Sequence, residues 1–197
     1  MTRCNGRIIE LDPALLSTPF KTQTKWYVLT GAACSGKTTI LDELARKGFK
    51  TIPESARYYF EYEITKGRSI EEIRKDGAAL QRGIAAMQLK FEHDNPVNTI
   101  TFLDRAIPDS LAFYRIFGLD PNEILPECFH YHYTAVFILD QLPFPRDKPL
   151  GPEDRASSIF LDEWLVRDYT ALGYRIVRVP VLPPQERLTY ILDRLDG

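Results

Sequence analysis

Residues 25–44, KWYVLTGAACSGKTTILDEL, decide the fold of this chain. They open with the apolar run 26–29, which predicts a buried strand. A turn follows over residues 31–38, where two glycines, a lysine and a threonine stand in the spacing GxxxxGK[ST]. Residues 39–47 then carry apolar side chains at helical spacing. The stretch therefore predicts a strand, a glycine-rich loop and a helix in immediate succession.

This pattern is a phosphate-binding P-loop, and its letters follow from the chemistry of holding a triphosphate. Gly31 and Gly36 lack a Cβ, so the backbone can wrap closely around an anion. The helix that follows aims its N–H groups and positive dipole end at the same phosphates. Lys37 supplies a positive charge for the β- and γ-phosphates, and the Thr38 hydroxyl is a ligand for Mg²⁺. The predicted ATP-binding residues are Gly31, Ala32, Ala33, Cys34, Ser35, Gly36, Lys37, Thr38 and Thr39.

The composition is that of an ordinary globular chain. The 197 residues are 44% apolar and 26% charged, which suits one domain with a full core. We expect an N-terminal extension over 1–24 and a single domain over 25–197. The net charge of −2 argues against nucleic acid as a partner, and the sequence leaves the oligomeric state open, a homodimer included.

No apolar stretch approaches 18 residues and the N-terminus has no signal-like apolar region, so we expect a cytoplasmic protein without a membrane span. The three cysteines, Cys4, Cys34 and Cys128, are widely spaced and form no CxxC pair. They therefore indicate neither a disulfide framework nor a zinc site.

Further strands and helices alternate along the rest of the chain. Apolar stretches predict strands at residues 49–53, 99–104, 134–140 and 174–181, and residues 7–11 have the pattern of a short edge strand. A capping box at Ser69 begins an amphipathic pattern that predicts one long helix up to Asn95. This alternation predicts an α/β fold, in which helices cover both faces of a parallel sheet.

Two of the predicted strands end in an aspartate that could hold Mg²⁺. Asp104 and Asp140 each follow an apolar strand, which is the Walker B arrangement. We prefer Asp104, because Arg105 comes directly after it and suits a phosphate site.

Glu54 stands at the carboxyl end of the strand predicted at 49–53, where ligands bind in open α/β sheets. It could orient or deprotonate an acceptor, with Arg57 also at the substrate site. Alternatively, Glu54 and Arg57 form a structural pair on the first helical turn. Gln81, midway along the long helix, could reach a substrate base, although a solvated polar face shared with Arg82 is the simpler interpretation.

Residues 141–157 are too polar and proline-rich for a core element. A segment of this length inside a compact domain is typical of an active-site lid. Arg155 could then close over the phosphates and stabilise the charge of the transition state. The alternative is an ordinary surface loop with solvated arginines.

With these motifs, the chain resembles the predicted ATPase group that is similar to the ribosylnicotinamide kinase domain and the nucleoside kinases. The resemblance is carried by GAACSGKTT, IPESAR, FLDRAIPDSLAFY, PRDKPLGPEDR and VPVLPPQERLTYIL, which span nearly the whole chain. It implies a three-layer P-loop fold with a five-stranded parallel sheet of order 2-3-1-4-5. It also implies ATP on the P-loop, Glu54 facing an acceptor hydroxyl, and Asp104 with Arg105 at the metal and phosphates.

Two functions remain in competition. In the first, the protein is a kinase that moves the γ-phosphate of ATP·Mg²⁺ to a small, nucleoside-like hydroxyl acceptor, with Lys37, Glu54, Asp104, Arg105 and Arg155 as catalytic residues. In the second, it is a regulatory NTPase whose conformation follows ATP or GTP. The absence of NKxD and DxxG motifs weakens the GTPase version of the second hypothesis. A P-loop fold without catalysis is a third interpretation, which the intact Lys37 and Thr38 disfavour.

Overall fold

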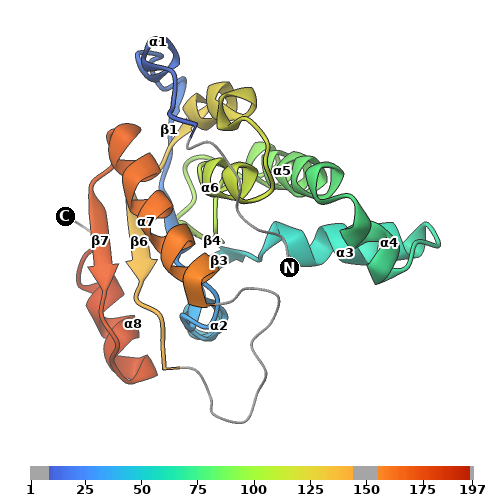
Figure 1. Cartoon of the computed structure of the whole chain (residues 1–197). Coiled ribbons are helices and arrows are strands. Elements are labelled where there is room, and N and C mark those ends of the chain that lie inside the picture. The colour runs from blue at the N-terminus through green and yellow to red at the C-terminus, as the bar shows by residue number, and fades with distance from the viewer. Residues whose placement is uncertain (1–8, 144–154, 196–197) are drawn as a thin grey trace.

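A computed structural model describes residues 9–143 and 155–195 of the chain (Figure 1). At its centre is a parallel sheet of five strands in the order β3-β4-β2-β6-β7. Counted along the chain, this is the order 2-3-1-4-5 that the resemblance implied. The strands are β2 (Trp26–Thr30), β3 (Lys50–Ile52), β4 (Thr101–Asp104), β6 (Ala135–Leu139) and β7 (Ile176–Val179).

The central strand β2 carries the P-loop. It pairs with β4 on one side, Trp26 opposite Thr101, and with β6 on the other, Tyr27 opposite Ala135. All five of its side chains are buried, as expected of a strand that is covered on both faces. The continuous apolar run of the sequence thus reflects its place in the middle of the sheet.

Helices cover both faces of the sheet (Figure 1). One face packs against α2 (Lys37–Arg46) and α8 (Pro184–Leu192), through apolar residues such as Leu44 and Leu188. The other face packs against α5 (Gly77–His93), α6 (Asp109–Ile116) and α7 (Arg155–Ala171). The edge strand β3 leads into α3 (Ser55–Thr65), and α4 (Ile70–Lys75) packs against α3 and α5. The predicted three-layer arrangement is confirmed.

The single long helix predicted from Ser69 to Asn95 is wrong. The capping box at Ser69 is present, but α4 ends at Lys75 and α5 begins at Gly77. Asp76 leaves the helical conformation, with φ −108° and ψ 89°, and its side chain accepts a hydrogen bond from Ala79 N. An apolar periodicity that continues across such a cap hides the break, because the spacing of the apolar residues does not change there.

The N-terminal segment also differs from the prediction. Residues 9–12 form no strand, and residues 7 and 8 of the predicted edge strand lie outside the described residues. Asp12 instead caps a short helix, α1 (Pro13–Leu16), by accepting a hydrogen bond from Ala14 N. Further on, β1 (Thr22–Gln23) pairs in parallel with β5 (Tyr131–His132) as a separate two-stranded sheet.

Two short 3₁₀ helices, η1 (Pro121–Glu123) and η2 (Leu125–Phe129), connect α6 to β5. Among the described residues, no helix is both long enough and apolar enough to cross a membrane.

Candidate functional site

The P-loop leaves β2 through two glycines in conformations that other residues rarely adopt. Gly31 has φ 137°, and a Cβ on it would lie 2.5 Å from the backbone oxygen of Leu139 in the neighbouring strand β6. Gly36 has φ 81°, in the left-handed region, immediately before α2 begins at Lys37. Both glycines are therefore required by geometry, one for close packing and one for the turn into the helix.

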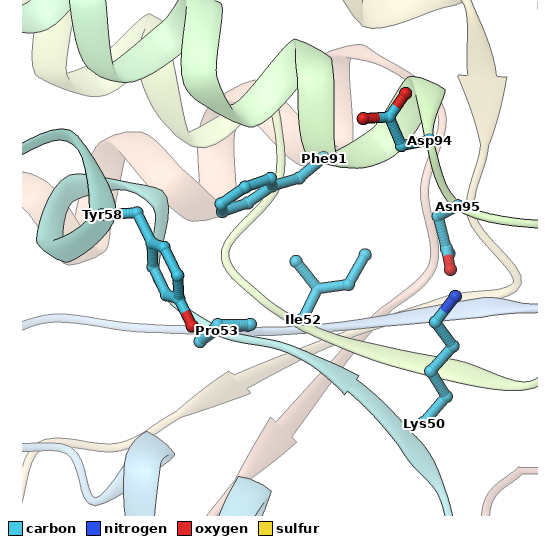
Figure 2. A pocket seen from close by; sticks show the side chains of 7 residues that line it. All are labelled: Lys50, Ile52, Pro53, Tyr58, Phe91, Asp94 and Asn95. Atoms are coloured by element: carbon cyan, nitrogen blue, oxygen red, sulfur yellow. The ribbon is translucent and has the colours of Figure 1, made fainter. Parts of the chain in front are cut away.

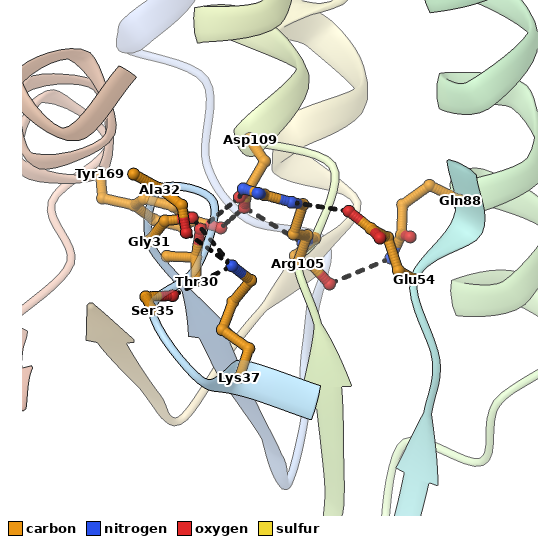
Figure 3. Close-up of polar contacts among 11 residues, drawn as sticks. Thr30, Gly31, Ala32, Ser35, Lys37, Glu54, Gln88, Arg105, Asp109 and Tyr169 are labelled. Atoms are coloured by element: carbon orange, nitrogen blue, oxygen red, sulfur yellow. Dashed lines mark hydrogen bonds and ion pairs between the residues drawn. The ribbon is translucent and has the colours of Figure 1, made fainter. Parts of the chain in front are cut away.

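The Lys37 side chain folds back into the loop that it terminates (Figure 3). Its Nζ donates hydrogen bonds to Gly31 O at 3.1 Å, Ala32 O at 3.0 Å and Ser35 Oγ at 3.1 Å. These acceptors are neutral, so the ammonium group keeps its charge available for an anion that enters the loop.

Opposing effects act on the pKa of Lys37. Burial is the main cause that lowers the pKa of Lys37, to about 8, and the nearby positive charge of Arg105 lowers it further. The carboxylates of Asp104, Glu54 and Asp109 act in the opposite direction. The lysine of the P-loop thus interacts electrostatically with residues from β4, α6 and the β3–α3 junction.

Two further loop carbonyls are held by the segment that follows β6. Gln141 Nε2 donates to Ala33 O at 2.9 Å, and Leu142 N donates to Cys34 O at 3.1 Å. A donor outside the loop thus holds each of these peptide groups in one orientation.

Arg105 lies between two carboxylates beside the loop (Figure 3). Its Nε donates to Glu54 Oε1 at 3.2 Å and its Nη1 to Asp109 Oδ1 at 3.1 Å. The side chain of Glu54 is 43% exposed, whereas that of Asp109 is 3% exposed. Arg105 also adopts a left-handed backbone conformation, φ 69°, and its N–H donates to Leu29 O of β2 at 3.0 Å. A strained non-glycine residue of this kind is often found at a functional site.

Asp109 is the residue that joins these elements, and it was not among the predicted site residues. Besides Arg105, its carboxylate accepts hydrogen bonds from the Thr30 hydroxyl, from Ala106 N at 3.1 Å and from the Tyr169 hydroxyl at 2.6 Å. It therefore connects the end of β2, the start of α6 and the C-terminal end of α7. Its i,i+4 spacing from Arg105 could have predicted the ion pair between the two residues. No sequence pattern predicted the contacts of Thr30 and Tyr169.

A second network of buried hydrogen bonds contacts the main chain at Arg105. Gln88 Nε2 donates to Arg105 O at 3.3 Å and to Glu92 Oε1 at 2.9 Å. Glu92 also accepts from Ile107 N at 3.0 Å and from the Tyr133 hydroxyl at 2.8 Å. Burial raises the pKa of Glu92 to about 7. These residues hold the backbone of the β4–α6 turn in place.

Asp104 has the properties expected of a cation ligand. It is 4% exposed, and its Oδ1 has no hydrogen-bond partner among the described residues. Burial raises the pKa of Asp104 to about 6, against the lowering effect of Lys37 and Arg105. A buried carboxylate oxygen without a donor is costly unless a cation or water satisfies it, so the residue fits a Mg²⁺ ligand.

Asp140, the other candidate Mg²⁺ ligand, forms an ion pair with an arginine. Its Oδ1 lies 3.1 Å from Nη2 of Arg178, which also pairs with Asp162 at 2.9 Å. Among the described residues, no group of three or more His, Cys, Asp and Glu side chains is assembled for a metal. Mg²⁺ is commonly held by one or two carboxylates together with substrate phosphates, which requires no such cluster.

The remaining predicted site residues of the loop and of α3 differ in their placement. Thr38 and Thr39 are exposed at the start of α2, as a loop that faces a ligand requires. Arg57 pairs with Glu61 at 3.2 Å and not with Glu54, so the alternative interpretation of a structural Glu54–Arg57 pair is wrong. Helical i,i+4 spacing favours Glu61, whereas Glu54 precedes the helix.

Gln81 is 7% exposed, so its assignment to a solvated face is also wrong. Its neighbour Arg82 does lie at the surface, paired with Glu123. The side chain of Arg155 and residues 144–154 of the predicted lid lie outside the described residues.

A separate apolar pocket of about 250 Å³ lies along the edge strand β3 (Figure 2). Its walls come from β3, α3 and the end of α5, and its lining residues are Lys50, Ile52, Pro53, Tyr58, Phe91, Asp94 and Asn95. None of the P-loop residues lines it, so it is distinct from the phosphate site.

The fold and the loop define a P-loop protein. Residues 26–187, most of the chain, match the model of a family described as an AAA domain. The chain belongs to this AAA-domain family. No curated protein sequence matches it.

Several solved structures share its fold. A NadR protein in complex with NR has a TM-score of 0.63 and 19% sequence identity, covering 88% of this chain and 52% of that one. The thymidylate kinase of Ehrlichia chaffeensis has a TM-score of 0.63 and 15% identity, covering 88% and 99%. The deoxyadenosine kinase of M. mycoides has a TM-score of 0.58 and 16% identity, covering 87% and 98%. This chain therefore spans about half the length of the NadR chain, and at such identities the likeness concerns the fold.

The buried position of Asp109 generates a stability prediction. Asp109→Ala would remove the buried partner of the Arg105 ion pairs, leaving the half-exposed Glu54, and would strip the Thr30 and Tyr169 hydroxyls of their acceptor. We expect the free energy of unfolding to fall by about 3 kcal/mol or more, because removal of one partner of a buried ion pair is strongly destabilising. Urea denaturation followed by circular dichroism measures the change.

Arg82→Ala, which breaks the exposed pair with Glu123, is the matched control and should cost far less. Equal losses in the two variants would show that Asp109 does not organise the site.

Proposed function

We propose that the protein transfers the γ-phosphate of ATP to a hydroxyl group of a small, nucleoside-like acceptor. The observation that carries this proposal is the ion pair between Arg105 and Glu54, which brings a half-exposed carboxylate next to the P-loop. A kinase needs an acid in this position, because its acceptor hydroxyl must meet the γ-phosphate and lose a proton there.

The nucleotide would bind along residues 31–39. The loop N–H groups and Lys37 would hold the β- and γ-phosphates, once Lys37 Nζ exchanges Gly31 O and Ala32 O for phosphate oxygens. Thr38 and Asp104 would hold Mg²⁺, which neutralises phosphate charge when it is bound. The unpartnered Oδ1 of Asp104 supports this assignment.

In the reaction, an oxygen of the acceptor hydroxyl forms a bond to the γ-phosphorus. The bond between that phosphorus and the β–γ bridging oxygen breaks, and ADP leaves with the electron pair of that bond. Glu54 takes the hydroxyl proton as general base. Arg105, held by Asp109, places positive charge beside the transferring group.

A nucleoside-like acceptor is favoured by the proteins that share the fold. They include deoxyadenosine kinase, thymidylate kinase and a NadR protein in complex with NR, although a shikimate kinase is also among them. Arg57 and Gln81 remain candidate substrate contacts, and Arg155 a candidate lid residue. The regulatory NTPase hypothesis predicts no acceptor, so the next experiment separates the two functions.

The role of Glu54 can be tested by Glu54→Gln, which keeps an oxygen for Arg105 but removes the base. We expect Mg²⁺·ATP affinity close to that of the original protein and a loss of acceptor phosphorylation of about a hundredfold or more. The assay is ATP consumption with a panel of nucleosides, followed by product analysis.

Glu61→Gln is the control, because Glu61 lies on α3, the helix that Glu54 precedes, and pairs with Arg57 at the surface. A Glu54→Gln enzyme that phosphorylates the acceptor at the original rate would remove Glu54 as the base. If no nucleoside stimulates ATP consumption, a nucleoside-like acceptor is excluded.

The metal assignment can be tested by comparing Asp104→Asn with Asp140→Asn. We expect the first change to raise the Mg²⁺ concentration needed for half-maximal activity about tenfold or more, because it weakens a direct or water-mediated ligand. The second change should have little effect, since Asp140 already pairs with Arg178. A Mg²⁺ titration of both variants gives the answer, and a larger shift for Asp140→Asn would reverse the assignment.

A further inference from the structure

Arg187, in the first half of α8, makes a set of contacts that the reaction does not explain. It is 2% exposed, and its guanidinium donates hydrogen bonds to three main-chain carbonyls. Nη1 donates to Ser35 O in the P-loop, Nη2 to Asp140 O at 2.7 Å and Nε to Pro180 O at 2.7 Å. One side chain thus joins the loop to the residues directly after β6 and β7.

Burying a guanidinium group is costly, and here its recorded hydrogen bonds go to neutral carbonyls and not to a carboxylate. Such an arrangement holds several carbonyl groups in fixed positions, since five N–H donors diverge from the one rigid, planar guanidinium group. A lysine at this position could not reach three separated acceptors in the same way.

The contact with Ser35 O determines where the next amide points. A peptide group is planar and trans, so its C=O and N–H point in opposite directions. Because the Ser35 carbonyl points at Arg187, the N–H of Gly36 points away from Arg187. Gly36 is the last residue before α2, where the N–H groups of a P-loop converge on a phosphate.

Arg187 also lies close to residue 36. A Cβ on Gly36 would lie 3.4 Å from Arg187 Nη1 and 3.3 Å from Leu142 Cδ1, in addition to the strain of φ 81°. The guanidinium thus packs directly beneath the turn of the loop.

We propose that Arg187 is a positioning residue for the phosphate site: it holds the Ser35–Gly36 peptide so that the Gly36 N–H donates to a bound nucleotide phosphate. This inference rests on the nucleotide-binding role proposed above. Arg187 touches no phosphate itself and acts through the loop backbone. The C-terminal helix α8 therefore contributes to nucleotide affinity, although it lies on the far side of the loop from the ligand.

A simpler role in stability would also follow from the buried contacts of Arg187, so the test must separate affinity from stability. Leu188→Ala provides the control, because Leu188 is the next residue of α8, is 1% exposed and packs in the apolar cluster of α2 and α8. Its truncation should destabilise the protein without changing the Ser35 peptide.

The experiment measures Mg²⁺·ADP affinity by calorimetry for the original protein, Arg187→Met, Arg187→Lys and Leu188→Ala, at a temperature where each is folded. We expect Arg187→Met to weaken binding at least tenfold and Arg187→Lys to weaken it less. Leu188→Ala should stay within twofold, despite a lower melting temperature. If Arg187→Met does not fold, the comparison of Arg187→Lys with Leu188→Ala decides in the same way.

Arginine variants that bind Mg²⁺·ADP within twofold of the original protein would overturn the inference, as would an equal loss of affinity in Leu188→Ala. A failure of the original protein to bind Mg²⁺·ADP at all would contradict the proposed function instead, so the two failures are distinguishable.

Discussion

The structure depends on a constraint at residues 31–35: a loop that offers its N–H groups to an anion must keep its carbonyl oxygens turned elsewhere. Each carbonyl in this range accepts a hydrogen bond, from Lys37, Gln141, Leu142 or Arg187. These donors come from α2, from the segment after β6 and from α8. Elements that meet at the carboxyl ends of the central strands therefore hold the backbone of residues 31–35 in place.

The charged residues beside the loop follow from the same requirement. A site that binds several phosphates needs positive charge, and Arg105 provides it only if its own orientation is fixed. Asp109 fixes it from α6, while Gln88 from α5 donates to its main-chain carbonyl and Glu92 accepts from Ile107 N two residues further on. Glu54 is the exposed member of this group, and its freedom suits a residue that meets an acceptor. The buried charged residues thus orient the side chains of the site. Their burial costs stability, which the apolar core on both faces of the sheet offsets.

Local sequence patterns predicted the sheet, its flanking helices and the P-loop, because these patterns reflect short-range physics. The glycines of GxxxxGK[ST] are needed by the loop itself, and apolar runs identify strands that are buried on both faces. The residues at strand ends, Glu54, Asp104 and Arg105, were predictable for a related reason. Parallel strands place their carboxyl ends along one edge, so side chains distant in sequence converge there.

The same patterns failed where a contact depended on distant parts of the chain. Tyr169 from α7 and Arg187 from α8 each reach the site, and neither was predicted as a site residue. The break at Asp76 was hidden, because the apolar periodicity continues across it. Arg57 was assigned to the site by its nearness to Glu54 in sequence, but on the helix it meets Glu61.

The most direct test of this account is a crystal structure of the protein with Mg²⁺ and a non-hydrolysable ATP analogue. We expect the phosphates to lie against the N–H groups of residues 31–38, with Lys37 Nζ moved from Gly31 O and Ala32 O to phosphate oxygens. The bonds that Arg187 and Gln141 make to the loop carbonyls should persist. A nucleotide bound elsewhere, or a loop whose Ser35 carbonyl faces the phosphates, would contradict the account.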